Sequence, residues 1–105
     1  MRMWNVPTVF LCRQHLLGEH NEMHSLSGCI KKGTSIKGYI TNGLIETHNI
    51  KKRHDELATE MTDRGYNHKS PLHEIKIGRS GFVDLEQSLK ELIKRCPKCK
   101  ERILK

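Results

Sequence analysis

The stretch Ile50-Lys51-Lys52-Arg53-His54-Asp55-Glu56-Leu57-Ala58-Thr59-Glu60-Met61-Thr62-Asp63-Arg64 carries a clear helix pattern. Its apolar residues Ile50, Leu57, Ala58 and Met61 fall on one helical face, and Gly65 follows as a stop signal. A helix with one apolar face has to bury that face against another element. The stretch therefore predicts a helix over 50–64 and favours a fold of packed helices.

A second helical pattern precedes this stretch. The residues Asn5-Val6-Pro7-Thr8 suit a helix start, and apolar residues then recur at helical spacing from Val9 to Leu17. Gly18 weakens the pattern, so we expect a separate helical piece that begins at Ser25 and stops at Gly33.

The last helix is marked by a capping-box pattern at Asp84 and Gln87, and Cys96-Pro97 should end it. We expect irregular structure over 33–49 and 66–83, with short strands near 35–36 and 39–40 as the weaker alternative. The fold class predicted is all-α. Residues 1–105 should form a compact single-domain bundle of three to four helices with long polar connections.

Composition restricts the function further. The formal net charge is +7, from 19 Lys and Arg against 12 Asp and Glu, and such a basic body attracts polyanions. No stretch is apolar enough to suggest a membrane span or a cleaved leader, so we expect a cytoplasmic protein. Its four cysteines should then be thiols or metal ligands.

The segment from Gln14 to His24 concentrates ionisable groups. His15, Glu19 and Glu22 stand at i, i+4 and i+7, which is one face of a helix. Two carboxylates beside an imidazole suit acid–base chemistry, although a solvated polar face has the same pattern. The spacing alone leaves both interpretations open.

Residue identities in this segment point to a family. Leu11, Gln14-His15-Leu16, Glu19 and Glu22 resemble the active-site helix of the phage endonuclease V, or pyrimidine-dimer DNA glycosylase, family. Residues 53–61 and Arg64-Gly65-Tyr66-Asn67 resemble its long third helix and the turn that follows. The resemblance covers residues 1–72, whereas 73–105 diverge as a C-terminal helix with a Cys-Pro-Lys-Cys tail.

The resemblance implies a DNA-repair glycosylase with abasic-site lyase activity. Such an enzyme excises damaged, pyrimidine-dimer-like bases from duplex DNA through an imine (Schiff base) formed by its N-terminal amine. An α-amine suits this role, because it is far less basic than a lysine side chain and is partly neutral near pH 7. We expect no cofactor, a monomer, and a bacterial or phage-infected cell as the setting.

Site residues carry over position by position. Met1 supplies the amine, and Arg2 after it should prevent removal of the initiator. Glu22 would stabilise positive charge on the sugar and relay protons, with His15 as a supporting group. Arg2 carries over as a phosphate contact beside the nucleophile. Gln14, His20, Asn21 and Arg79 are further candidate DNA contacts that do not come from this carry-over.

Lysine and arginine clusters add to the expected DNA surface. One loop carries Lys31, Lys32 and Lys37, and a second cluster comprises Lys51, Lys52 and Arg53. Arg79 lies between two glycines, where exposed backbone amides suit a phosphate. Together these groups favour a surface that follows a DNA backbone.

The pair Cys96 and Cys99 has the spacing of a zinc knuckle, but a zinc site needs four ligands. His20 and His24, one helical turn apart, are candidates for the other two, and Cys29 or a partner subunit is a further source. Free thiols remain the simpler interpretation.

Two other function classes fit the same residues. The first is a DNA-binding module without catalysis, with or without a zinc staple, which would have no use for a free N-terminus. The second is a metal-dependent nuclease that uses His20, Glu22 and His24. Sensitivity to chelators would distinguish this nuclease from imine chemistry.

Overall fold

A computed structural model describes residues 1–68, 71–72 and 77–105 of the chain. Over these ranges the protein forms five α-helices and two 3-10 turns and contains no β-strand, which confirms the predicted all-α class. The strands considered near 35–36 and 39–40 are wrong, because this part of the chain forms a short helix instead. The elements are η1 (Thr8–Phe10), α1 (Arg13–Lys32), α2 (Lys37–Thr41), η2 (Thr47–Asn49), α3 (Ile50–Asp63), α4 (Leu85–Arg95) and α5 (Pro97–Leu104).

The longest helix, α1, differs from the prediction in its start and in its continuity. It begins at Arg13 with Cys12 as its N-cap, whereas Asn5 adopts a left-handed backbone with φ of 58°. It also runs unbroken through Gly18, since burial of a face that includes Leu16 and Met23 outweighs the roughly 1 kcal/mol that a helical glycine costs. The predicted stop at Gly33 is confirmed, with φ of 73°.

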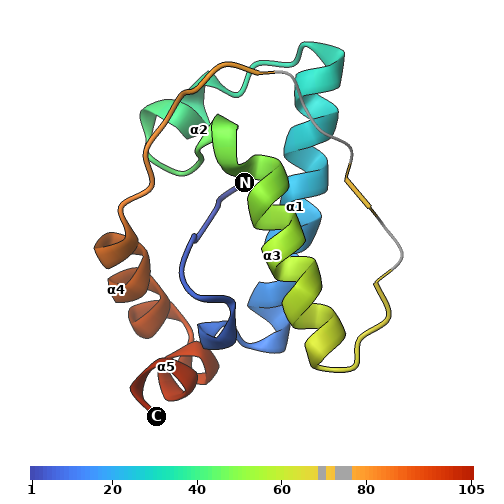
Figure 1. The fold of residues 1–105 in the computed structure, drawn as a ribbon. Helices are drawn as coiled ribbons and strands as arrows, with labels where there is room; N and C mark the ends of the chain where they lie inside the picture. Colours follow the sequence, from blue (N-terminus) through green and yellow to red (C-terminus); the bar gives the residue numbers. More distant parts are fainter. Residues whose placement is uncertain (69–70, 73–76) are drawn as a thin grey trace.

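Helices α1 and α3 lie side by side and run in opposite directions (Figure 1). Their facing sides bury Leu16, Met23, Leu26, Leu57 and Met61, which belong to one hydrophobic core. The predicted helix over 50–64 therefore forms nearly as expected, and it ends before Gly65, whose φ is 86°. In the described ranges, no helix combines the length and the apolar character needed to cross a bilayer.

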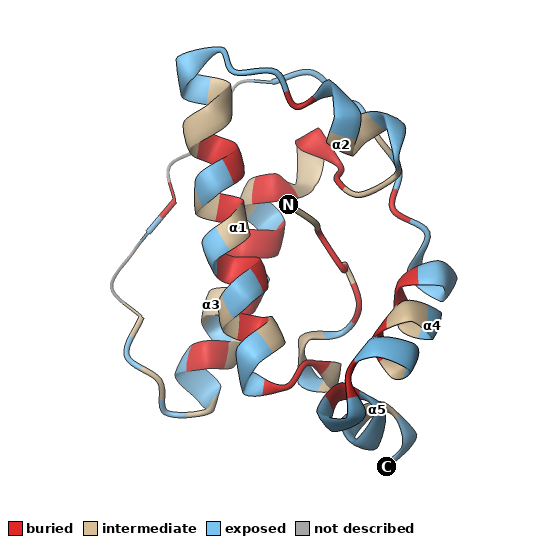
Figure 2. Cartoon of the chain, turned by 180° about the vertical axis from the view of Figure 1, so that it is seen from behind, coloured by how far each residue is buried: buried red, intermediate tan, exposed pale blue. Residues whose placement is uncertain are grey.

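The N-terminal segment is part of the core. Residues 1–7 run between the α1–α3 pair and α4 (Figure 1), and Met3, Trp4 and Val6 are buried (Figure 2). The backbone amide of Met3 donates a hydrogen bond to the carbonyl oxygen of Leu44 at 2.7 Å. The start of the chain is thus held in a defined position.

A buried ion pair anchors this segment. The guanidinium of Arg53 on α3 donates two hydrogen bonds to the carboxylate of Glu19 on α1, at 2.6 and 2.9 Å, and both side chains are almost fully buried. Glu19 also accepts a hydrogen bond from the backbone amide of Trp4, and Arg53 donates one to the carbonyl oxygen of Val6. The pair therefore joins both long helices to the N-terminal segment.

Of the two C-terminal helices, the sequence predicts α4 but not α5. Asp84 caps α4 by accepting hydrogen bonds from the backbone amides of Glu86 and Gln87, which confirms the predicted helix start. Cys96-Pro97 ends α4, but Pro97 also occupies the first turn of α5, where its missing N–H costs nothing. Helix α5 packs on η1, and its Cys99 joins the common core.

We expect Glu19→Gln to lower the free energy of unfolding by about 3–5 kcal/mol, because it leaves the buried Arg53 without its counter-charge. Glu56→Gln is the matched control. The exposed Glu56 carboxylate lies 3.5 Å from the same guanidinium, so this change should cost less than about 1 kcal/mol. Urea unfolding of both variants measures the free energies. Equal losses of unfolding free energy would show that the buried ion pair is no more important to stability than the exposed one.

Candidate active site

Glu22 on α1 faces the start of the chain. Its carboxylate accepts a hydrogen bond from the backbone amide of Arg2 at 3.2 Å. This amide joins Met1 to Arg2, so the carboxylate lies within one residue of the N-terminal amine. Met1 and Glu22 are both partly exposed, and a reacting group can therefore approach them from solvent.

The Arg2 side chain lies between two neighbours. Its guanidinium stacks over the Trp4 ring, with 3.9 Å from Cζ to the ring centroid, and donates a 2.7 Å hydrogen bond to Glu91 of α4. That hydrogen bond is the main reason why the pKa of the Glu91 carboxyl lies below its usual value. The Arg2 side chain therefore ties the first residues to α4, while the Arg2 backbone amide binds the Glu22 carboxylate.

His15 packs against the Trp4 ring. The two rings meet edge to face, with centroids 5.9 Å apart, and His15 Nδ1 lies 3.2 Å from Cys12 Sγ. Burial lowers the pKa of His15, and the carboxylates of Glu19 and Glu22 only partly oppose that shift. The predicted face of His15, Glu19 and Glu22 therefore does not form one site. His15 packs against Trp4 and Cys12, Glu19 is buried with Arg53, and Glu22 faces the start of the chain.

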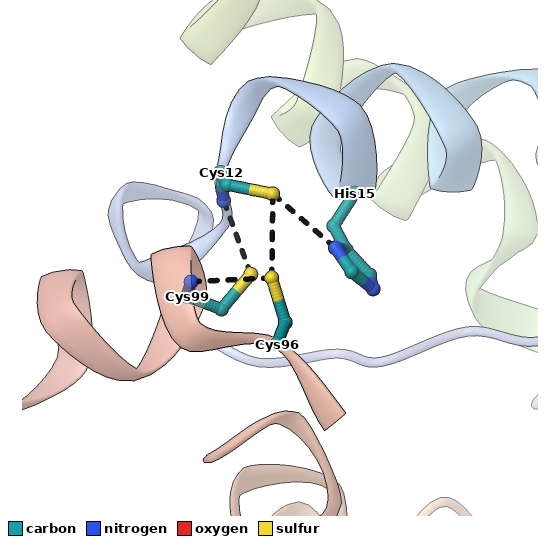
Figure 3. A group of neighbouring side chains, drawn as sticks. All are labelled: Cys12, His15, Cys96 and Cys99. Carbon is teal, nitrogen blue, oxygen red and sulfur yellow. Dashed lines mark hydrogen bonds between the residues drawn. The ribbon is translucent and has the colours of Figure 1, made fainter. Parts of the chain in front are cut away.

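The cysteine pair meets a different histidine from those considered. Cys96 and Cys99 lie beside Cys12 and His15 (Figure 3), whereas His20 and His24 belong to a separate group. The structure does not bring the proposed ligands Cys96, Cys99, His20 and His24 together. Burial raises the pKa of the Cys99 thiol to about 12, while for Cys96 hydrogen bonds from Cys99 and Cys12 outweigh burial and lower it.

His20 and His24 point toward α3. Together with His54 and His68 they form a group of four imidazoles, separate from Glu22 within the part of the chain that is described. The metal-nuclease set of His20, Glu22 and His24 is therefore not gathered. Burial, followed by repulsion from the three other rings, lowers the pKa of His20 to about 4, so this ring is neutral at physiological pH.

The expected DNA contacts differ in accessibility. Gln14, Asn21 and Arg79 are exposed, and Arg79 is held in a segment whose Gly78 and Ser80 carbonyl oxygens accept hydrogen bonds from Thr47. His20 is only 4% exposed, so its ring does not offer a contact to a DNA backbone. Arg53 does not belong to the exposed basic cluster predicted with Lys51 and Lys52, because it is 3% exposed and paired with Glu19.

Four partners at these sites were missed from the sequence: Cys12, His54, His68 and Glu91. One available signal was that Cys12 and His15 repeat the three-residue spacing of Cys96 and Cys99. The sequence places His54 on the predicted helix over 50–64, and nothing local links it to His24. Glu91 carries no local signal, because its role depends on how α4 packs.

Comparison with known proteins adds an independent finding. The model of the pyrimidine dimer DNA glycosylase family matches residues 1–74, which include α1, α3, Glu22 and the N-terminal segment. No curated protein and no solved structure matches the chain. Because the matched region covers more than half of its residues, the chain belongs to the pyrimidine dimer DNA glycosylase family of DNA-repair enzymes, which act on DNA.

Proposed function

We propose that this protein is a DNA glycosylase with abasic-site lyase activity, and that the N-terminal amine of Met1 is its nucleophile. The observation that carries the proposal is the hydrogen bond from the Arg2 amide to Glu22, which sets a carboxylate next to the chain start in a member of this family. The damaged nucleotide must leave the base stack for its sugar to reach this position. Pyrimidine dimers and abasic sites in duplex DNA are the proposed substrates.

The chemistry proceeds in two stages. The neutral amine attacks C1′ of the sugar, an N–C1′ bond forms, and the bond to the base breaks as the base leaves with a proton. The C1′–O4′ bond of the sugar ring then opens, O4′ takes up a proton, and the amine nitrogen forms an iminium with C1′. The iminium acidifies the C2′ proton, and removal of that proton expels the 3′ phosphate and cleaves the strand. The Glu22 carboxylate is suited to stabilise the positive charge at C1′ and to accept or return these protons.

Other residues position the reacting groups. Arg2 is the proposed contact to the phosphate beside the lesion, with Gln14, Asn21 and Arg79 as further contacts along the backbone. His15 enters as a supporting residue, because its ring contacts the Trp4 ring that carries the Arg2 guanidinium. The protein is proposed to act as a monomer.

Two insertions after Met1 test the nucleophile. Inserting Thr gives a chain from which the initiator is removed, so the amine returns to its present place on a Thr residue. Inserting Lys leaves Met in place and moves the amine outward by up to ~3.5 Å. Since an error of about 1 Å can cost ~10²-fold in rate, borohydride should trap the Thr variant on abasic DNA and barely trap the Lys variant.

Mass spectrometry first confirms the two N-termini, and thermal unfolding confirms that both chains fold. Equal yields of the covalent adduct from the two proteins would show that a lysine side chain, and not the terminal amine, attacks the sugar. No adduct from the wild type would instead support a binding module without catalysis.

For Glu22→Gln we expect base release to fall by about 10²–10⁴-fold while DNA affinity changes little. Glutamine keeps the shape of the side chain and removes the charge that the sugar needs. Glu86→Gln, which changes an exposed carboxylate on α4, is the matched control and should keep full activity. Alkali-labile strand breaks in irradiated duplex DNA measure cleavage of the base–sugar bond, and fluorescence anisotropy with an abasic-site analogue measures DNA affinity. Near-normal cleavage by the Glu22→Gln variant excludes this role.

A further inference from the structure

Two helix starts meet at one point of the structure. Cys12 occupies the N-cap position of α1 and His15 lies in the first turn of that helix. Cys96 occupies the N-cap position of α5, where its sulfur accepts a hydrogen bond from the amide of Cys99 in the first turn. The two pairs have the same three-residue spacing and face each other (Figure 3). One ligand atom from each residue lies within 4.8 Å of all the others.

We propose that Cys12, His15, Cys96 and Cys99 bind a structural zinc ion through three thiolates and His15 Nδ1. Zinc prefers four tetrahedral ligands, with Zn–S near 2.3 Å and Zn–N near 2.0–2.1 Å, so neighbouring ligands are separated by about 3.8 Å for two sulfurs and about 3.6 Å for sulfur and nitrogen. The structure has 3.7 Å between Cys12 Sγ and Cys96 Sγ, and 3.2 Å between Cys12 Sγ and His15 Nδ1. Small adjustments of the side chains complete the tetrahedron.

Backbone amides donate to two of the three sulfurs. The backbone amide of Cys12 donates to Cys99 Sγ at 3.2 Å, and that of Cys99 donates to Cys96 Sγ at 3.3 Å. Amide donors and helix N-termini both stabilise negative sulfur, and α1 and α5 begin here. Zinc binding would release three thiol protons to solvent. A disulfide does not describe the cluster, because its S–S bond is about 2.05 Å and joins only two of three sulfurs.

The zinc would connect the divergent C-terminal helices to the family core. It would join the start of α5 to the start of α1 across 84 residues of chain. Helix α4 directly precedes Cys96, and its Glu91 binds Arg2 beside the chain start. A zinc ion here is a positioning element, since all four ligands come from the protein and no position is left for water.

The fourth cysteine supplies a matched control. Cys29 is partly buried on α1 but lies outside this cluster. We expect protein purified with zinc to lose one metal equivalent in Cys99→Ser and none in Cys29→Ser. Replacement of zinc by cobalt should give an intense sulfur-to-cobalt charge-transfer band in the wild type and in Cys29→Ser.

Cys99→His provides a second test in case Cys99→Ser fails to fold. It preserves four ligands, so it should still bind the metal, with a weaker charge-transfer band because one thiolate is lost. A wild-type protein without this band, or equal effects of Cys29→Ser and Cys99→Ser, overturns the zinc site and leaves a core of free thiols. Metal content and the cobalt spectrum are measured without DNA, so their outcome is independent of the imine chemistry.

A second group of ligands lies farther along α1. His20 and His24 occupy successive turns of α1, His54 comes from α3 and His68 follows it, and their ring nitrogens also lie within 4.8 Å of one another. The Nε2 atoms of His24 and His54 are 3.1 Å apart, and those of His20 and His68 are 2.9 Å apart. Four imidazoles thus converge on one small volume.

We infer that this histidine group is a second metal site, for a divalent first-row transition ion such as zinc. Imidazole is a ligand suited to these ions, and the tetrahedral edge for four nitrogens is about 3.4 Å. His54 Nδ1 also lies 2.9 Å from the carboxylate of Asp55, and ligating histidines usually donate their second N–H to such a group. Because this contact turns His54 Nε2 toward the other rings, it supports the second site separately from the cysteine cluster.

This site has its own measurement. Wild-type protein should bind two metal equivalents, and His24→Asn should lose the equivalent that gives no sulfur-to-cobalt band. His48→Asn, which changes a histidine outside the group, should lose neither. The exposed Asp55→Asn should fold normally and weaken the second equivalent by about 10–100-fold. Two outcomes would show that the four histidines form a core without metal. In the first, His24→Asn and Asp55→Asn both retain two metal equivalents at wild-type affinity. In the second, the wild type binds only the ion held by the thiolates.

Discussion

The position of the chain start depends on the buried pair of Glu19 and Arg53. A carboxylate and a guanidinium are both removed from solvent, and each is satisfied by the other and by the N-terminal backbone. Such a pair contributes little net stability compared with apolar residues of the same size. Its effect is to specify one arrangement, since any shift of the N-terminal segment would leave a buried charge without its hydrogen bonds.

This constraint explains how the start of the chain can occupy a defined position, as the proposed nucleophile requires. Chain ends are usually among the least ordered parts of a protein. Here Met3, Trp4 and Val6 are buried, and the amides of Met3 and Trp4 are bound to Leu44 and Glu19. The residues before them are therefore restricted, and Glu22 can keep its carboxylate beside the first peptide bond.

Helix α1 organises each of the proposed sites. From one end to the other it presents His15 to the cysteines, Glu19 to Arg53, Glu22 to the chain start, and His20 and His24 to the other histidines. Different faces of one helix thus carry unrelated chemistry. In a chain of 105 residues with a modest core, buried metal ions would add stability that apolar contacts alone supply only sparingly.

Local sequence patterns determined the helical class, the helices near 50–63 and 85–95, the cap at Asp84 and the family, because these depend on neighbouring residues and on short motifs. They did not determine where α1 begins, since Asn5 and Thr8 offer a local cap and only packing of the N-terminal segment overrides it. Nor did they show that Arg53 is a buried anchor or that Cys96 and Cys99 meet Cys12 and His15. Those outcomes were decided by the tertiary structure, because they join groups 34 to 87 residues apart and the fold alone brings such groups within bonding distance.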